Sequence, residues 1–215
     1  MSDALRGRFI TLEGIEGAGK SSAMAALAAH LTERGNPPVV TREPGGTSLG
    51  ESVRGLLLDH ASDGMHGETE ALLIFAARCE HLHRVVRPAL EQGQWVLCDR
   101  FTDATYAYQG AGRGLGAERV AALEEWVQGD LRPDLTLVLD VPVAQGRDRA
   151  GTRGEPDRFE REKDAFFERV RACYRQRASA EPERMRLIDA AADQDAVLYA
   201  LRDALDAWLT ERGLA

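Results

Sequence analysis

Residues 8–22 read RFITLEGIEGAGKSS and carry a pattern typical of one kind of α/β fold. It starts with a short run of β-forming residues, passes through three glycines and ends on a lysine and two serines. Residues 14–21, GIEGAGKS, match the pattern G-x-x-x-x-G-K-[ST] of a phosphate-binding loop between a strand and a helix. Glycines let successive N–H groups curl toward a phosphate, and the helix that follows adds positive potential at its N-terminus.

Most residues of this loop have an expected role if the ligand is the phosphate chain of ATP. The lysine would reach the β- and γ-phosphates, and the hydroxyl of Ser21 would hold Mg²⁺, the expected cofactor. Together with Ser21, the expected ATP contacts in this region are Gly14, Glu16, Gly17, Ala18, Gly19, Lys20 and Ser22. The alternative is a glycine-rich turn that binds no ligand.

Strands alternate with helices through the rest of the chain. The expected strands are residues 8–13, 38–42, 95–98, 135–139 and 185–188. The expected helices are residues 20–34, 49–60, 68–91, 117–128, 143–150, 158–180 and 195–209. This alternation predicts one α/β domain over residues 1–215, with a mostly parallel sheet covered on both faces. The glycine-containing segments 62–67, 110–116 and 151–156 are expected to be flexible.

The composition narrows the classes of function. The 215 residues are 44% hydrophobic and 29% charged, with a net charge of -8, which makes general nucleic-acid binding a poor hypothesis. No stretch reaches the ~18 apolar residues of a membrane span, and the first residues, MSDALRGRF, lack an apolar signal segment. The three cysteines are scattered without C-x-x-C spacing, which favours the cytoplasm over a disulfide framework or a zinc site.

A candidate carboxylate for binding Mg²⁺ follows the apolar strand WVLC. Asp99 is placed there like the carboxylate that holds Mg²⁺ through water in P-loop enzymes. A GTPase would need an N-K-x-D motif, but the single asparagine, Asn36, precedes a proline. Motor ATPases usually need a longer chain. A non-catalytic nucleotide-binding module remains an alternative, although it would be expected to lose Lys20, Ser21 and Asp99.

Four further segments resemble the thymidylate kinases, in order and over nearly the whole chain. They are TREPGGT at 41–47, FAARCEH at 75–81, DRF with TYAYQGAGRG within 99–114, and RGEPDRFE at 153–160. The resemblance implies transfer of a phosphoryl group from ATP to dTMP with Mg²⁺, and a homodimer. It also implies a P-loop three-layer sandwich with a five-stranded sheet in the order 2-3-1-4-5 and a small lid. Another nucleoside monophosphate kinase, for uridylate, cytidylate or adenylate, remains an alternative.

The same resemblance implies contacts to the base of the acceptor. Phe75 would stack on the thymine ring, Arg78 would donate to a base carbonyl and Thr105 would touch the base edge. Glu43 and Pro44 of the TREPGG segment are further expected contacts. Plain core packing is the alternative for Phe75.

Other matching residues are implied at the sugar and the phosphates. Arg100 would bind the acceptor phosphate, since a guanidinium fork fits two phosphate oxygens. Tyr108 would lie against C2′ and exclude a ribose hydroxyl, with Gln109 supporting it. Glu16 would order the acceptor sugar and the water around the metal. A surface ion pair for Arg100 and a solvated carboxylate for Glu16 are the alternatives. Ala104 stands where the family often has serine, which puts one hydroxyl contact in doubt.

Residues 147–158 are expected to form the lid. The variable positions of the phosphate-binding loop, residues 15–18, carry no basic side chain, as in thymidylate kinases with a basic lid. The catalytic set is therefore Lys20, Glu16, Arg100 and, from the lid, Arg153. Arg149 is a further expected ATP contact and, with Arg158, a substitute for Arg153. Residues 161–177 are expected to be a solvated helix with ion pairs, because acids are interleaved with its arginines.

Overall fold

Five parallel strands form one sheet in the computed structural model, which describes residues 7–151 and 157–214. Their order is β2-β3-β1-β4-β5, as the resemblance predicts. The strands are β1 (Phe9–Gly14), β2 (Val39–Arg42), β3 (Val96–Asp99), β4 (Leu135–Asp140) and β5 (Met185–Asp189). All six residues of β1 are buried, because this strand is central and covered on both faces.

The register of the strands brings their carboxyl ends to one edge of the sheet. Leu12 of β1 pairs with Asp99 of β3, and Gly14 pairs with Leu139 of β4. The loops that follow these strands therefore start side by side. In open parallel sheets, ligands bind in the crevice outside this edge.

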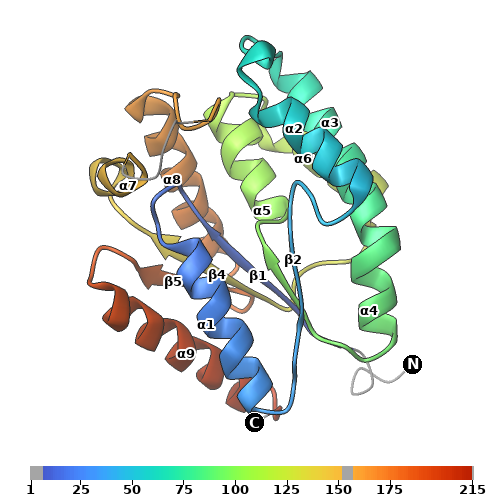
Figure 1. Cartoon of the computed structure of the whole chain (residues 1–215), viewed down its shortest axis with the longest axis vertical. Helices are drawn as coiled ribbons and strands as arrows, with labels where there is room; N and C mark the ends of the chain where they lie inside the picture. The colour runs from blue at the N-terminus through green and yellow to red at the C-terminus, as the bar shows by residue number, and fades with distance from the viewer. Residues whose placement is uncertain (1–6, 152–156, 215) are drawn as a thin grey trace.

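Helices cover both faces of the sheet, so the predicted fold class is confirmed (Figure 1). Helices α1 and α9 lie on one face, and α8 and α5 lie on the other. The helices are α1 (Lys20–Glu33), α2 (Ser48–Leu58), α3 (Gly67–His81), α4 (Arg87–Glu91), α5 (Thr102–Thr105), α6 (Ala117–Gln128), α7 (Val143–Ala150), α8 (Asp164–Ala180) and α9 (Gln194–Glu211). Short 3₁₀ or π segments are η2 (His60–Ser62), η3 (Leu82–Val86) and η4 (Tyr106–Gly112).

The charged helix expected over residues 158–180 begins only at Asp164. Asp157 and Glu160 hold a turn instead, because Asp157 Oδ1 accepts from the backbone N–H groups of Phe159 and Glu160, and Glu160 Oε2 accepts from that of Asp157. Such local side-chain bonds compete with helix formation. The turn also directs Arg158 into the interior, where it is buried.

The segment near residue 110 was predicted to be flexible, but one of its glycines serves close packing. Residues 106–112 form the buried π segment η4, which continues α5 and packs against α8. A Cβ atom on Gly112 would lie 2.6 Å from the ring of Phe166. Glycine is thus needed there for close packing, which local sequence patterns do not distinguish from mobility.

Helix α3 buries one face and exposes the other. Leu72 is 54% exposed and Ala76 is exposed, whereas Ala71, Ile74 and Phe75 are buried.

Within residues 7–151 and 157–214, none of the helices combines the length and apolar character required to cross a bilayer.

Candidate active site

The loop between β1 and α1 presents its lysine and an open helix end to the edge of the sheet. Lys20 Nζ donates to the carbonyls of Gly14, at 3.1 Å, and Ile15, at 3.0 Å. Gly19 precedes α1 with φ 93°, and no side chain caps the first N–H groups of the helix. Those donors suit an anion. Burial, followed by repulsion from Arg100, lowers the pKa of Lys20 to about 8. An anion such as a phosphate would stabilise the charged form of Lys20 in this site.

Helix α7 packs directly on this loop. A Cβ atom on Gly17, which has φ 73°, would lie 1.8 Å from the carbonyl oxygen of Gly146. A Cβ atom on Gly146 would in turn lie 2.8 Å from the carbonyl oxygen of Glu16. Both glycines are therefore required by close backbone approach.

A cavity of about 280 Å³ joins this loop to a second group of polar side chains. Lys20 and Ser21 line it beside Asp99 of β3. The predicted residues that line it are Glu16, Gly17, Gly19, Lys20, Ser21, Glu43, Pro44, Arg78, Asp99, Arg100, Thr105, Tyr108 and Gln109. Segments distant in the sequence thus share one cavity.

Arg100 stands beside the loop in a constrained conformation. Its φ of 67° is the single positive value at a non-glycine residue in the described part of the chain. Its guanidinium donates to Glu16 Oε1 at 2.8 Å and to the carbonyl of Gly14 at 2.9 Å, and it lies 4.7 Å from the ring of Tyr108. The Tyr108 hydroxyl also donates to Glu16. Glu16 thus pairs with Arg100 and offsets its charge.

Arg78 occupies another part of the cavity and is held on several sides. Its Nε donates to Glu43 Oε2 at 2.7 Å, and its Nη2 donates to Thr105 Oγ1 at 3.0 Å. The rings of Phe75 and Phe101 lie 4.6 and 4.9 Å from the guanidinium carbon. Its Nη1 is buried without a hydrogen-bond partner. A buried orphan donor on a cavity wall is a candidate ligand contact.

Asp99 fits a divalent cation. Its Oδ1 is buried and has no hydrogen-bond partner, and Ser21 lines the same cavity. Hard cations such as Mg²⁺ take oxygen ligands and usually keep several waters, so one carboxylate and one hydroxyl suffice beside phosphate oxygens.

Residues 12–199 match the sequence model of the family described as Thymidylate kinase. The chain belongs to the thymidylate kinase family. The thymidylate kinase of Alkalilimnicola ehrlichii is 62% identical over 206 residues, which cover 95% of each chain. The thymidylate kinase of Pseudomonas putida is 60% identical over 208 residues, covering 97% of this chain and 99% of its own. The crystal structure of thymidylate kinase from Ehrlichia chaffeensis has a TM-score of 0.75 and 35% identity, with 94% of this chain and 99% of that chain covered.

Some of the predicted contact residues lie outside the cavity wall. Phe75 is buried behind Arg78 and packs with Tyr106 and Val120. Arg149 donates to the carbonyls of Ala190 and Ala191. Gly14 and Ala18 of the loop and Ser22 of α1 do not line the cavity, and Arg153 lies outside the described residues.

Several residues that line the cavity were not among the predicted contacts. Arg54 of α2 lines the cavity and donates to the carbonyl of Pro44. Burial, together with the cation of Arg42, lowers its pKa. Apolar walls come from Leu57, Ile74 and Phe101. Arg54 follows the PGGT turn on the next helix, so its proximity to that turn was the one available signal.

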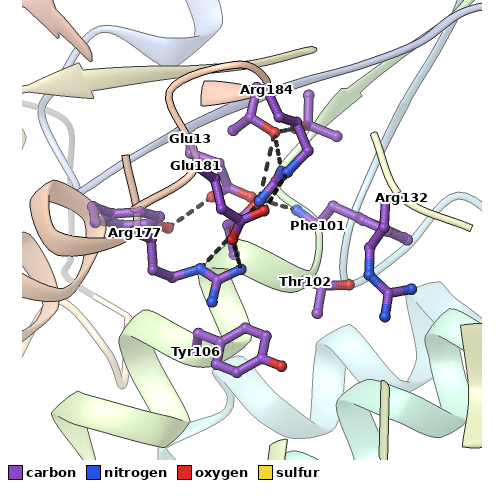
Figure 2. A network of polar contacts seen from close by, with 12 residues as sticks. Glu13, Phe101, Thr102, Tyr106, Arg132, Arg177, Glu181 and Arg184 are labelled. Carbon is purple, nitrogen blue, oxygen red and sulfur yellow. Dashed lines mark hydrogen bonds and ion pairs between the residues drawn. The ribbon is translucent and has the colours of Figure 1, made fainter. Parts of the chain in front are cut away.

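Beneath the thymidylate kinase cavity, Glu13 supports the turn that carries Arg100. Glu13 Oε1 accepts from the backbone N–H of Phe101 and Oε2 accepts from the Tyr174 hydroxyl, both at 2.7 Å. Figure 2 shows Glu13 beside Phe101, with Arg177 and Arg184 in the same network of polar contacts. Both arginines donate to Asp103. Burial, followed by repulsion from Asp103, raises the pKa of Glu13 from 4.5 to about 7.

This pKa shift predicts a pH-dependent contribution to stability. The folded protein binds the Glu13 proton more tightly than the unfolded chain does, so stability falls as pH rises from 4.5 to about 7. Relative to Glu13→Gln, which does not titrate, the wild type should lose about 3 kcal/mol of unfolding free energy across this window. Urea denaturation at a series of pH values measures it. Exposed Glu33→Gln is the control, and a difference that stays constant with pH would contradict the assignment.

Proposed function

We propose that this protein transfers the γ-phosphoryl group of ATP to dTMP and releases ADP and dTDP, the reaction of its family. The observation that carries the proposal is the shared cavity, in which the phosphate-binding loop faces Arg100, Tyr108 and Arg78. One end offers Lys20 and an open helix N-terminus for a phosphate chain. The other offers a buried orphan donor for a base carbonyl.

The chemistry needs position and charge rather than a strong base. The acceptor phosphate of dTMP is already ionised, so no proton has to be removed before attack. Arg100 would exchange Glu16 for the acceptor phosphate, and Lys20 would neutralise charge on the transferring group. Holding both phosphates in one cavity converts a bimolecular encounter into an oriented step.

Ser21 and Asp99 would hold Mg²⁺ with the phosphates of ATP, Asp99 through water. The ion would supply positive charge that lowers the repulsion between the two substrates. The orphaned Oδ1 of Asp99 supports this assignment.

The remaining acceptor contacts are proposed as the family resemblance implies them. Glu43, Pro44, Thr105 and Gln109 would surround the base and sugar, and Phe75 would stack on the thymine ring. Residues 1–215 would form one kinase domain with a lid at 147–158. Because residues 15–18 carry no basic side chain, the protein would be a thymidylate kinase of the type in which the lid supplies the catalytic arginine.

Tyr108 is expected to determine the choice of sugar. Its ring lies in the cavity wall and packs against Phe159 and Phe166. Tyr108→Ala should bring the kcat/KM values for dTMP and its ribose counterpart closer together, because a wall that excludes a hydroxyl is removed. The difference in activation free energy between the two acceptors should fall by ~1–3 kcal/mol. Tyr108→Phe is the matched control, since it keeps the ring and should keep the preference. An unchanged ratio in Tyr108→Ala would assign the ring to packing alone.

Release of ADP across a panel of monophosphates tests the function itself. We expect dTMP to be the preferred acceptor over UMP, CMP and AMP. Preference for another acceptor would indicate a different nucleoside monophosphate kinase. ATP binding without ADP release in any mixture would indicate a non-catalytic nucleotide-binding module.

Assembly and location are also part of the proposal. Leu56, Leu72 and Trp126 are 54%, 54% and 81% exposed on α2, α3 and α6, which supports a homodimer packed through these helices. Light scattering on the purified protein measures the mass. The three cysteines are free thiols, which supports the cytoplasm as the compartment.

A further inference from the structure

A chain of buried hydrogen bonds links β2 to Arg78 through His81. Thr41 Oγ1 lies 2.7 Å from His81 Nε2, and His81 Nδ1 lies 2.8 Å from Glu43 Oε1. The other oxygen of Glu43 accepts from Arg78 Nε at 2.7 Å. His81, Glu43 and Arg78 are all buried, so water does not compete for these bonds.

The direction of each bond in this chain follows from its chemistry. A carboxylate paired with a guanidinium is ionised and only accepts, so His81 Nδ1 carries a proton and donates to Glu43. In the neutral ring, Nε2 is then the acceptor for the hydroxyl of Thr41. His81 therefore occupies the oxygen of Glu43 that Arg78 does not use.

That occupancy determines how Arg78 is oriented. With Oε1 held by His81, Glu43 binds Arg78 through Nε alone, and Nη2 is left to Thr105. Without His81, the freed oxygen would lack a donor in a dry site, which is costly. It would take the neighbouring Nη2–H of Arg78, because Nε and Nη2 form the planar fork that suits a carboxylate. The guanidinium would turn, and its orphan Nη1 would turn with it.

The position of Arg78 indicates which atom of a pyrimidine it meets. Arg100 contacts the phosphate-binding loop, whereas Arg78 contacts Glu43 and Thr105 in another part of the cavity. A nucleotide with its phosphate at Arg100 directs the far side of its base toward Arg78. In a pyrimidine, C4 lies across the ring from N1, which bears the sugar. Thymine has a carbonyl acceptor at C4 and cytosine has an amino donor, while arginine only donates.

We propose that His81 is a positioning residue for base selection: by holding Glu43 it orients Arg78 so that Nη1 selects a carbonyl over an amino group at C4 of the acceptor base. The inference rests on the proposed function. It goes beyond the contact of Arg78 itself, because His81 is beyond the reach of the substrate and does not line the cavity.

The test compares kcat/KM for dTMP, dCMP and dUMP on the same preparation of each variant. His81→Leu should lower the dTMP-to-dCMP ratio about tenfold, because a misdirected donor no longer separates carbonyl from amino. The dTMP-to-dUMP ratio reports the methyl group at C5 and should stay within about twofold. A ratio measured on one preparation does not depend on the fraction of folded enzyme.

Two further variants and a control separate orientation from general support. In His81→Asn the amide still donates to Glu43 and should restore most of the preference. Glu43→Gln keeps the side-chain volume but loses one acceptor, and it should lower the dTMP-to-dCMP ratio as His81→Leu does. His83→Ala removes an exposed histidine near the same helix end and should change neither ratio.

The outcomes that oppose the inference are distinct from failure of the proposed function. Equal losses on all three acceptors, or unchanged ratios in both His81→Leu and Glu43→Gln, would overturn the role of His81. A wild-type protein that releases no ADP with dTMP would overturn the proposed function, and this inference with it. A wild type that is active on dTMP while the variants fail the ratio test leaves the function standing and rejects His81.

Discussion

Lys20→Ala is expected to lower kcat at least ~100-fold, because it removes a positive charge directed at the transferring phosphoryl group. Lys20 Nζ donates to two carbonyls of its own loop. The charged form is disfavoured in this site, since its pKa is lowered to about 8. Its removal should therefore leave the fold intact.

The chain offers a matched control for this variant. Lys163 is the one other lysine in the sequence, and it is exposed just before α8. Lys163→Ala should retain wild-type kcat. Steady-state release of ADP and the thermal unfolding midpoint are measured for both. Normal turnover of dTMP by Lys20→Ala would show that the loop is not the phosphate cradle.

Arg153→Ala is expected to lower kcat about 10³-fold, at the lower end of the effect of an arginine finger. The residue lies outside the described part of the structure, and it is proposed because the other cations have other roles. In the proposed reaction, Lys20 would cover one side of the transferring group and Arg100 would bind the acceptor. Arg158 is buried against Glu70 and the carbonyl of Leu57, so it is no longer a good substitute.

Single-turnover kinetics separates the chemical step from binding in this variant. The affinity for dTMP should change little, and Arg153→Lys should recover only part of the rate because lysine lacks the planar fork. Exposed Arg161→Ala controls for the loss of one positive charge near the same segment. An undiminished chemical step in Arg153→Ala would reject the assignment and direct the same measurement to Arg149.

Local patterns in the sequence determined the elements and the phosphate loop. Residues 14–21 combine glycines, Lys20 and Ser21 in an order that few other structures require, and a strand and a helix flank them as predicted. Helices 117–128 and 143–150 were predicted to the residue, since turns or glycines bound them. The acceptor segments were recognised by resemblance, not by periodicity.

The tertiary structure decided which of these residues meet and how they are held. Helix α8 begins at Asp164 and not at residue 158, because the turn at Asp157 places Arg158 against Glu70, which is 88 residues away in the sequence. Long-range packing also chose the partners of Glu43, a predicted substrate contact that lines the cavity: its two oxygens bind Arg78 and His81 of α3. Periodicity reports which face of an element is apolar, whereas a buried polar partner is chosen by long-range packing, because each buried donor and acceptor must find its match wherever the fold places it.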